Sequence, residues 1–376
     1  MSECLRTESS KRILILTNND VGLYRFRADL IKELVSSGCC VNISLPRGEL
    51  TGEIEKLGCG VVLTPLDRRG MNPFRDISLF FRYRALLGET KPDLVVTYTV
   101  KPNIYGGIAC RIAHIPYASN ITGLGSAIEN GGALKKFVLF LYRIALRDAK
   151  VVFFENTSNR DALCAEGAVP QGRDVVLGGA GVNLDDYPYI EYPRDTDGTV
   201  RFLFVGRVMR EKGVNELFAA AEMMKKEYGE RAQFHVVGSF EEACKPVMDA
   251  LEERGIVKYH GYQSNVKKFY AMASCVVLPS YHEGMSNVLL EAAASGRPLI
   301  TSDIPGCREA ADDGVSGFLC EPKSADGLYA AMKKFMLLSA AEREQMGRAG
   351  RRRIENRFSK RAVVAQTIRS LELSNE

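Results

Sequence analysis

The segment CVVLPSYHEGMSNVLLEAAASGRPLITSD, residues 275–303, contains one complete unit of an alternating fold. A short apolar run at 275–280 reads as a strand, and a polar loop with Gly284 follows it. An Ala- and Leu-rich helical pattern then runs to Gly296, before a second strand pattern, RPLITS. Strand, helix and strand in this order predict a parallel βαβ unit.

The same alternation extends through all 376 residues. Helical patterns such as RADLIKELVSSG separate most of the strand patterns. The strand patterns are RILILT, VNISL, VVLT, DLVVTYT, YASNIT, VVFFE and DVVLG in the first half, and VRFLFVG, AQFHVVG, VKYHG, CVVLPS and RPLITS in the second. We therefore predict an α/β fold with two Rossmann-like parallel-sheet domains facing across a cleft.

The alternation stops once, at residues 178–199, where Gly, Asp, Pro and Tyr dominate without an apolar period. This break divides the chain into an amino-terminal domain at 1–182, a linker at 183–199 and a carboxy-terminal domain at 200–356. The last residues, 357–376, form a further helical pattern. Ligands bind such sheets beyond the carboxyl ends of the strands, so the strand-end loops are the candidate sites.

Two glutamates in the opening segment stand eight positions apart. Glu283 lies in the polar loop and is expected to be exposed, whereas Glu291 lies in the apolar helical run and is expected to be buried with a partner. Eight helical residues rise about 12 Å, which is too far for two carboxylates to act at one glycosidic bond. The spacing favours two separate hydroxyl-binding groups on one extended ligand.

Three strand-end loops have residues suited to an anionic ligand. In FVGRVMREKG, Arg207 and Lys212 could flank a diphosphate, with exposed surface charges as the alternative. In YHEGMSN, the backbone N–H groups from Gly284 to Asn287 lie at a predicted helix N-terminus and could bind an anion. Two anion-binding loops and two carboxylates together suit a sugar nucleotide.

The third loop, TNNDVGLYRFRADL, joins a strand ending at Thr17 to a helix predicted to begin near Phe26. Gly22 would allow a phosphate to approach the backbone, although a glycine here is also an ordinary turn residue. Arg25 and Arg27 could pair with anionic groups or be surface charges. The loop lacks GxGxxG, which argues against a nicotinamide or flavin cofactor.

Charge is unevenly distributed, although the net charge is only +4. Residues 68–150 have 13 Lys or Arg against 5 Asp or Glu, and aromatic residues are interleaved with these charges. One interpretation is a pair of core helices with basic solvent faces, and the other is a face that rests on an anionic membrane. No apolar run reaches the length of a membrane-spanning helix. The sequence has no signal-peptide pattern and no CxxC pair, and of its cysteines only Cys39 and Cys40 are adjacent, which predicts a cytoplasmic location.

Several motifs resemble one known family, the retaining glycosyltransferases of family 4 with the GT-B fold. EGMSNVLLE resembles its Glu-x7-Glu signature, and GRVMREKG resembles its Gly-Arg…Lys-Gly loop. GAGVNLDDY, HGYQSNV and SDIPGCREAADDGVSGFL are similar to further family segments in the same order. In the first half, GLYRFR, MNPF, VKPNIYGGIA, PYASNITGLGSAIENGG and FFENTSNRD resemble enzymes that extend polyprenyl-diphosphate-linked sugars, N-acetylgalactosaminyl- and galactosyltransferases above all.

The resemblance implies a retaining, metal-independent transfer of a hexose or N-acetylhexosamine from a UDP-sugar to a polyprenyl-diphosphate-linked saccharide. It implies no cofactor and no nucleic-acid partner, and it places the enzyme peripherally on the inner face of the plasma membrane. Arg207 and Lys212 would grip the donor diphosphate, Glu283 would hold the donor sugar, and Glu291 the ribose. The donor-binding set it implies is Gly22, Arg207, Lys212, His260, Gly261, Tyr262, Gln263, Glu283, Gly284, Met285, Ser286, Asn287 and Glu291, with Glu283, Arg207 and Lys212 as the catalytic residues.

The sequence departs from the family pattern in the amino domain. Many members have a histidine near the end of the strand that here reads YASNITGLG, where this chain has Asn120 and Thr122. We therefore predict a structural role for His114 and assign no catalytic histidine. The candidate acceptor-binding residues are Arg25, Lys101, Asn103, Asn120, Thr122 and Gly123. The resemblance also implies that a helix at about 357–373 returns to the amino domain.

Two alternatives remain at this point. UDP-sugar 2-epimerases share the architecture, and a binding subunit without catalysis would keep the same fold. The strand-end loops contain no Asp-x-Asp pattern, in agreement with metal-independent transfer.

Overall fold

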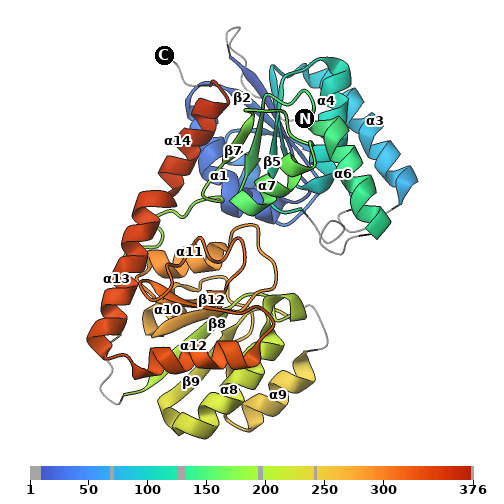
Figure 1. Ribbon diagram of the computed structural model, residues 1–376. Coiled ribbons are helices and arrows are strands. Elements are labelled where there is room, and N and C mark those ends of the chain that lie inside the picture. The colour runs from blue at the N-terminus through green and yellow to red at the C-terminus, as the bar shows by residue number, and fades with distance from the viewer. Residues whose placement is uncertain (1–9, 68–71, 125–131, 194–197, 241–243, 374–376) are drawn as a thin grey trace. The chain divides into compact units, whose positions relative to one another are not determined.

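The computed structural model describes residues 10–67, 72–124, 132–193, 198–240 and 244–373. The chain divides into two compact units (Figure 1). The first unit extends to Ala180 and includes the carboxy-terminal segment from Val363, and the second extends from Gly181 to Ala362. Each unit is built on one parallel sheet, which confirms the predicted fold class.

The sheet of the first unit has the strand order β3-β2-β1-β4-β5-β6-β7. All seven strand patterns predicted in this half are strands. Alternate residues of β1 face opposite sides, since Leu14 and Leu16 pack in one core cluster and Ile13 and Ile15 in the other. The strands are β1 Arg12–Leu16, β2 Cys40–Leu45, β3 Gly60–Leu63, β4 Leu94–Tyr98, β5 Tyr117–Ile121, β6 Val151–Phe154 and β7 Asp174–Val176.

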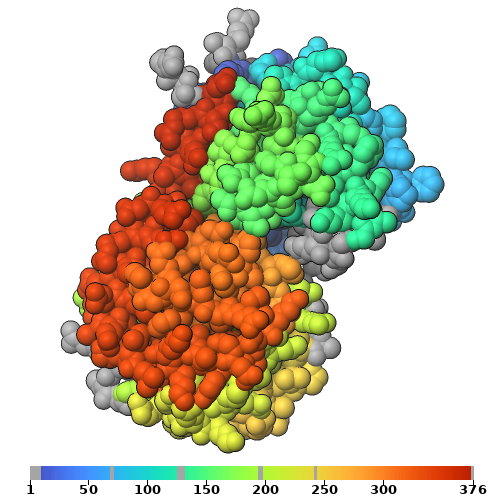
Figure 2. All heavy atoms as spheres, in the orientation of Figure 1, coloured from blue at the N-terminus to red at the C-terminus, as the bar shows by residue number. Residues whose placement is uncertain are grey.

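Helices cover both faces of this sheet (Figure 1). One core cluster contains residues of α3, α4 and α6, and the other contains residues of α1 and α14. In the space-filling view α3 and α6 form part of the outer surface of this unit (Figure 2). The helical elements are α1 Asp20–Ser36, α2 Thr51–Glu55, α3 Pro73–Thr90, the π-helical turn η1 Pro102–Gly106, α4 Gly107–Ala113, α6 Gly132–Leu146, α7 Thr157–Ala165 and α14 Lys360–Ser370.

The sheet of the second unit has the order β10-β9-β8-β11-β12-β13. Its strands are β8 Val200–Val205, β9 Ala232–Val237, β10 Lys258–Tyr259, β11 Cys275–Leu278, β12 Leu299–Ser302 and β13 Gly317–Cys320. The sequence patterns predicted five of these six strands and missed β13. The helical elements are η2 Arg210–Lys212, α8 Val214–Tyr228, η3 Gly229–Arg231, α9 Lys245–Glu253, α10 Lys267–Met272, α11 Asn287–Ala294, α12 Ala325–Leu337 and α13 Ala340–Arg357.

The segment expected to be the linker packs within the second unit. The side chain of Arg297 is fully buried, and its guanidinium donates to the carbonyl oxygens of Ile190, Glu191 and Ala273. Burial lowers the pKa of Arg297 to about 10, because removing the guanidinium from water disfavours its charge. A buried cation thus holds the expected linker, at Ile190 and Glu191, against the second unit.

Candidate active site

The strand order of the second unit predicts where a ligand binds. Successive connections run outward in opposite directions from β8 and β11, which pair side by side. Sheets with this strand order bind ligands at the carboxyl edge, beside the loops that follow these two strands. The loop after β8 contains Arg207 and Lys212, and the loop after β11 contains Glu283.

An ion pair joins these two loops. Lys212 Nζ lies 2.5 Å from Glu283 Oε1, and the Ser280 hydroxyl donates to the same oxygen at 2.8 Å. Only 19% of the Lys212 side chain and 12% of the Glu283 side chain are exposed. The structure thus brings together two of the three residues predicted to be catalytic, and it contradicts the expectation that Glu283 is exposed.

Gly213 makes this approach possible. It follows Lys212 with φ +70°, and a Cβ there would overlap the carbonyl oxygen of Pro279. The loop is also fixed from the other side, because the Tyr281 N–H donates to the Glu211 carbonyl at 2.9 Å. The Tyr281 hydroxyl donates to the Glu216 carboxylate at 2.7 Å, and burial, then this carboxylate, raises the pKa of Tyr281 to about 12.

The loop from Glu283 to Ser286 lies against Gly306, in the segment SDIPGCREA after β12. Gly306 has φ +84°, and a Cβ there would come within 2.5 Å of the Glu283 carbonyl oxygen. The Ser286 N–H donates to the Gly306 carbonyl at 2.9 Å, and the Ser286 hydroxyl caps α11 by accepting from Leu289 N–H. The Ser286 amide is therefore already used, although it was predicted to contact the donor. Met285 is buried, and Gly284 and Asn287 are half-buried.

Glu291 is the fifth residue of α11, and the Tyr270 hydroxyl donates to its Oε2 at 3.1 Å. Glu291 is half-buried, so the prediction that it is buried is wrong. The helix begins at Asn287, so only part of the eight-residue spacing from Glu283 is helical. The expected rise of about 12 Å between the glutamates assumed a continuous helix and does not apply.

A histidine pair joins β9, which contains His235, to His260, which directly follows β10. His235 Nδ1 and His260 Nε2 are 2.9 Å apart, and the two rings stack. The Gly238 N–H donates to the Gly261 carbonyl at 2.9 Å, and Gln263 Nε2 donates to the His260 carbonyl at 2.8 Å. Tyr262 is 60% exposed. His260 and Gly261 are therefore held in place by backbone hydrogen bonds, and Gln263 by its side chain. His235 is a contact that sequence reasoning missed.

This histidine pair predicts an acid-sensitive second unit. Burial first, and then His260, lowers the pKa of His235 from 6.5 to about 4. In the unfolded chain the histidine binds a proton at its ordinary pKa of 6.5, whereas in the folded chain it does so only near pH 4. The stability contributed by neutral His235 is therefore fully present above pH 6.5 and is lost as the pH falls toward 4. We expect His235→Asn to lose less unfolding free energy than the native chain between about pH 7 and pH 4.5 in urea titrations. Exposed His114→Asn is the control, and identical pH profiles for all three proteins would contradict this account.

Arg207 follows β8 directly and is exposed. The next residue, Val208, donates its N–H to the Ser239 carbonyl at 2.8 Å, which fixes the backbone at the strand end. Arg207 and Lys212 thus come from the same loop, one exposed and one mostly buried. A planar guanidinium and a point-like ammonium in one loop suit a diphosphate.

The first unit has its own switch point, between β1 and β4. Helix α1 begins at Asp20 and not near Phe26, so Gly22 lies in its first turn. The Gly22 N–H donates to the Asn19 side-chain oxygen at 2.6 Å, because Asn19 caps the helix. The predicted strand-to-helix loop at Gly22 is therefore wrong, and its N–H is already used. Arg25 is exposed on the same helix.

Arg27, considered as a ligand contact, is buried. Its Nη2 lies 2.9 Å from Glu155 Oε1, and its guanidinium lies over the Tyr98 ring. Only 8% of its side chain is exposed. The residue stabilises the carboxyl edge of the sheet from within, so its interpretation as a surface charge is wrong.

The candidate acceptor residues after β4 and β5 have different environments. Lys101 Nζ lies 2.6 Å from Asp76 Oδ1, and the Tyr105 hydroxyl donates to the other carboxylate oxygen at 3.1 Å. Asn103 is fully buried, where it accepts from the Thr97 hydroxyl and donates to the Asn120 carbonyl. Asn103 therefore supports the sheet and is not placed to touch an acceptor.

Asn120 is 3% exposed, and its Nδ2 has no hydrogen-bond partner within the described parts of the chain. Thr122 and Gly123 follow it and are half-buried. His114 is the C-cap of α4 with φ 54°, which fits the structural role predicted for it. Met71 of the MNPF motif, and 125–131 of the GLGSAIENGG segment, lie outside the described residues.

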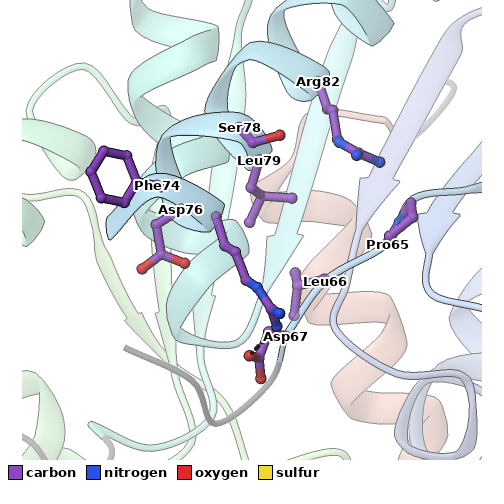
Figure 3. Close-up of a pocket in the computed structure, with 9 residues that line it drawn as sticks. Pro65, Leu66, Asp67, Phe74, Asp76, Ser78, Leu79 and Arg82 are labelled. Atoms are coloured by element: carbon purple, nitrogen blue, oxygen red, sulfur yellow. Dashed lines mark hydrogen bonds and ion pairs between the residues drawn. The ribbon is translucent and has the colours of Figure 1, made fainter. Parts of the chain in front are cut away.

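A groove of about 680 Å³ lies beside the first half of α3 (Figure 3). Arg75 lines it, with Nη1 3.1 Å from the Asp67 carboxylate. Pro65, Leu66 and Leu79 give it apolar walls (Figure 3). Asp76, which holds Lys101, also lines it. The groove is thus connected to a predicted acceptor residue. Phe74 of the MNPF motif also lines it, although that motif did not predict a groove.

Two family models match the chain and together cover most of it. Residues 193–353 match the glycosyl transferases group 1 model, and residues 22–179 match the glycosyl transferase 4-like domain model. The chain is a GT-B glycosyltransferase of group 1. This family assignment confirms the resemblance that the Glu-x7-Glu segment and the Arg207 loop predicted.

Relatives with assigned activities include two bacterial glycosyltransferases. The N,N'-diacetylbacillosaminyl-diphospho-undecaprenol alpha-1,3-N-acetylgalactosaminyltransferase of Campylobacter jejuni is 29% identical over 334 residues, 84% of this chain and 87% of that protein. The capsular polysaccharide biosynthesis glycosyltransferase CapM of Staphylococcus aureus is 27% identical, over 77% of this chain and 80% of its own.

Solved structures share the fold of this glycosyltransferase. HepE of Anabaena, in complex with UDP, superposes with a TM-score of 0.78 at 17% identity, covering 96% of this chain and 99% of that one. A glycosyltransferase of Rickettsia africae superposes with a TM-score of 0.77 at 17% identity, covering 97% and 100%.

Proposed function

We propose that this glycosyltransferase moves a hexose or N-acetylhexosamine from a UDP-sugar to a polyprenyl-diphosphate-linked saccharide, with retention and without a metal. The observation that carries the donor assignment is the Lys212–Glu283 ion pair at the switch point of the second unit. An ammonium binds a phosphate well, and a carboxylate binds sugar hydroxyls well. One donor molecule can therefore replace the ion pair with a phosphate contact to Lys212 and hydroxyl contacts to Glu283. The Campylobacter jejuni relative, whose name gives an undecaprenol-diphosphate-linked acceptor, supports the acceptor class.

The chemistry follows from these positions. As the bond between the sugar C1 and the phosphate oxygen breaks, negative charge grows on the diphosphate, and Arg207 and Lys212 stabilise it. The acceptor hydroxyl attacks C1 from the face that the diphosphate leaves, and its proton passes to a phosphate oxygen. One C–O bond forms and one breaks, which gives a glycoside and UDP. Glu283 orients the sugar through its hydroxyls and forms no covalent bond to it.

The two glutamates should have separable roles. Glu283→Gln should lower kcat for transfer by about 10²-fold, because the amide loses the charge that holds the sugar and pairs with Lys212. Glu291→Gln should chiefly weaken UDP binding, by about tenfold, since we place the ribose hydroxyls at this carboxylate. Isothermal titration with UDP and steady-state kinetics measure the two effects. Equal losses of UDP affinity in both variants would contradict the division.

Retention and metal independence are tested together. Proton NMR of the first product should give the same anomeric configuration as the donor. Excess EDTA should leave the rate unchanged, because the cations of Arg207 and Lys212 supply the positive charge that Mg²⁺ supplies elsewhere. An inverted product would exclude same-face attack, and reversible inhibition by EDTA that Mg²⁺ relieves would show a metal requirement.

We also propose a peripheral location on an anionic inner-leaflet surface, which suits a lipid-linked acceptor. Within the described residues, no helix is both long and apolar enough to cross a bilayer.

A further inference from the structure

Two helices of the first unit are apolar on the side that faces solvent. In α3, Phe74, Ile77 and Phe81 are 81%, 54% and 63% exposed, whereas Leu79 and Tyr83 on its other side are buried. Figure 3 shows Phe74 on the side of α3 away from Pro65, where it also lines one end of the groove. A helix on the surface of a soluble domain normally has a polar outer face, so this arrangement needs a reason.

Helix α6 also has an apolar side that faces solvent. Leu134, Phe137 and Phe140 are 39%, 56% and 55% exposed and recur every third residue, so they share one side of the helix. The opposite side is buried in the core through residues such as Val138 and Tyr142. Helix α4 contacts both α3 and α6 and adds Ile112, which is 52% exposed. The three helices lie together in one layer of the unit (Figure 1).

We call Phe74, Ile77, Phe81, Leu134, Phe137 and Phe140 the aromatic patch. Its four phenylalanines expose on the order of 500 Å², taking about 200 Å² for a whole ring side chain. The largest apolar patch on a typical monomer exposes about 300–600 Å² and is often functional. In the space-filling view, α3 and α6 lie at the surface of the unit (Figure 2).

The charges around the patch select the partner. Lys135, Lys136 and Arg143 lie on α6, which has no Asp or Glu, and Arg147 follows the helix. Arg82 and Arg84 are exposed on α3. Phenylalanines on the outer face with basic residues beside them match an anionic lipid bilayer, where rings enter the acyl boundary and cations meet the headgroups.

We propose that α3 and α6 dock this enzyme on an anionic bilayer by inserting the phenylalanines of the aromatic patch. The choice of a bilayer rests in part on the proposed function, because a lipid-linked acceptor requires the enzyme to work at a membrane. The proposal goes further than charge attraction. It names the inserting rings and predicts binding that persists when salt screens the basic residues.

The chain contains no tryptophan, so a single introduced tryptophan reports on its own surroundings. We would compare Phe81→Trp and Phe137→Trp with Leu337→Trp, a control at a position 74% exposed on α12 of the second unit. The probe is vesicles of phosphatidylcholine with roughly one-third phosphatidylglycerol, with and without brominated acyl chains. The two patch reporters should shift to shorter emission wavelength and be quenched by bromine, and the control should do neither.

Several results would overturn the proposal. Patch reporters that keep their aqueous emission on protein that sediments with vesicles would show that another face docks. Equal quenching in all three reporters, or no sedimentation with vesicles, would also reject it.

A second set of variants tests whether the rings supply affinity. The triple change Phe81→Ser, Phe137→Ser and Phe140→Ser should weaken vesicle binding at least about tenfold, whereas Leu337→Ser should not. Thermal unfolding checks that the triple variant is folded. Unchanged vesicle affinity, with loss of a dimer in sedimentation velocity, would assign the patch to a second copy of the chain and reject the bilayer.

Transfer to a short-chain, water-soluble diphosphate-linked acceptor separates this proposal from the proposed function. The triple variant should keep native activity on that acceptor and lose activity on a long-chain acceptor in vesicles. If the tryptophan variants insert their reporters but the native enzyme transfers to neither acceptor, the proposed function fails and the docking surface stands. Loss of activity on both acceptors in the folded triple variant would place the rings in the active site and reject their docking role.

Discussion

Replacing Lys212 with methionine should lower kcat/KM for glycosyl transfer by about 10²- to 10³-fold, the usual effect of removing one group that stabilises transition-state charge. Methionine keeps the length of the side chain and removes the ammonium that lies 2.5 Å from Glu283. The variant loses the positive charge that stabilises the leaving diphosphate. It also loses the contact that holds the Glu283 carboxylate. Steady-state kinetics over a range of donor concentrations measures the effect.

The matched control is Lys245→Met. Lys245 forms an ion pair with Asp249 on the surface of α9 in the same unit, and 66% of its side chain is exposed. Exposed pairs of this kind contribute little to stability, so its kinetics should match the native enzyme. If Lys212→Met also keeps native kcat/KM, the loop after β8 does not bind the diphosphate.

Replacing Gly213 with alanine should lower the free energy of unfolding of the second unit by more than about 3 kcal/mol. The loss should be smaller if the two loops of the donor site move apart. Two penalties combine here. A non-glycine residue at φ +70° costs about 1 to 2 kcal/mol, and its Cβ would overlap the Pro279 carbonyl oxygen. Relief requires the loop of Lys212 to move away from the loop of Glu283. Denaturant unfolding of the second unit and UDP titration measure both outcomes.

Gly255→Ala separates the two penalties. Gly255 has φ +67°, but a Cβ there would meet no atom within 4 Å. The Gly255→Ala variant should lose only about 1 to 2 kcal/mol of unfolding free energy, from the strained backbone at positive φ, and should keep native UDP affinity. Equal effects of the two substitutions would show that the approach of Gly213 to Pro279 does not determine the geometry of the site.

Most of the fold could be predicted because its signals are local. Strands buried on both faces read as continuous apolar runs, so β1, β4 and β6 were visible in RILILT, DLVVTYT and VVFFE. Strand β13 was missed because Gly317–Cys320 is short and follows a turn-rich segment without a clear period. The start of α1 was misplaced because Asn19 caps the helix before any apolar repeat begins.

The site was predictable in its residue types but not in its contacts. The motifs located Arg207, Lys212 and Glu283 in loops that follow strands, and Glu291 in the helix after one of these loops. The burial of Glu283 was not predictable, because its partner Lys212 lies 71 positions away. The same reason applies to Arg27 with Glu155 and to His235 with His260, whose pairing depends on the order of the strands in the sheet.

The most direct test of the central proposal is one transfer assay. Purified enzyme is incubated with a panel of radiolabelled UDP-sugars, each with and without polyprenyl-diphosphate mono- and disaccharides, and label is measured in the lipid extract. We expect label to enter the lipid fraction from one UDP-sugar, only with acceptor present, and Glu283→Gln to abolish most of it. Conversion of the UDP-sugar without any acceptor, or binding of every donor with no transfer, would contradict the proposed glycosyl transfer.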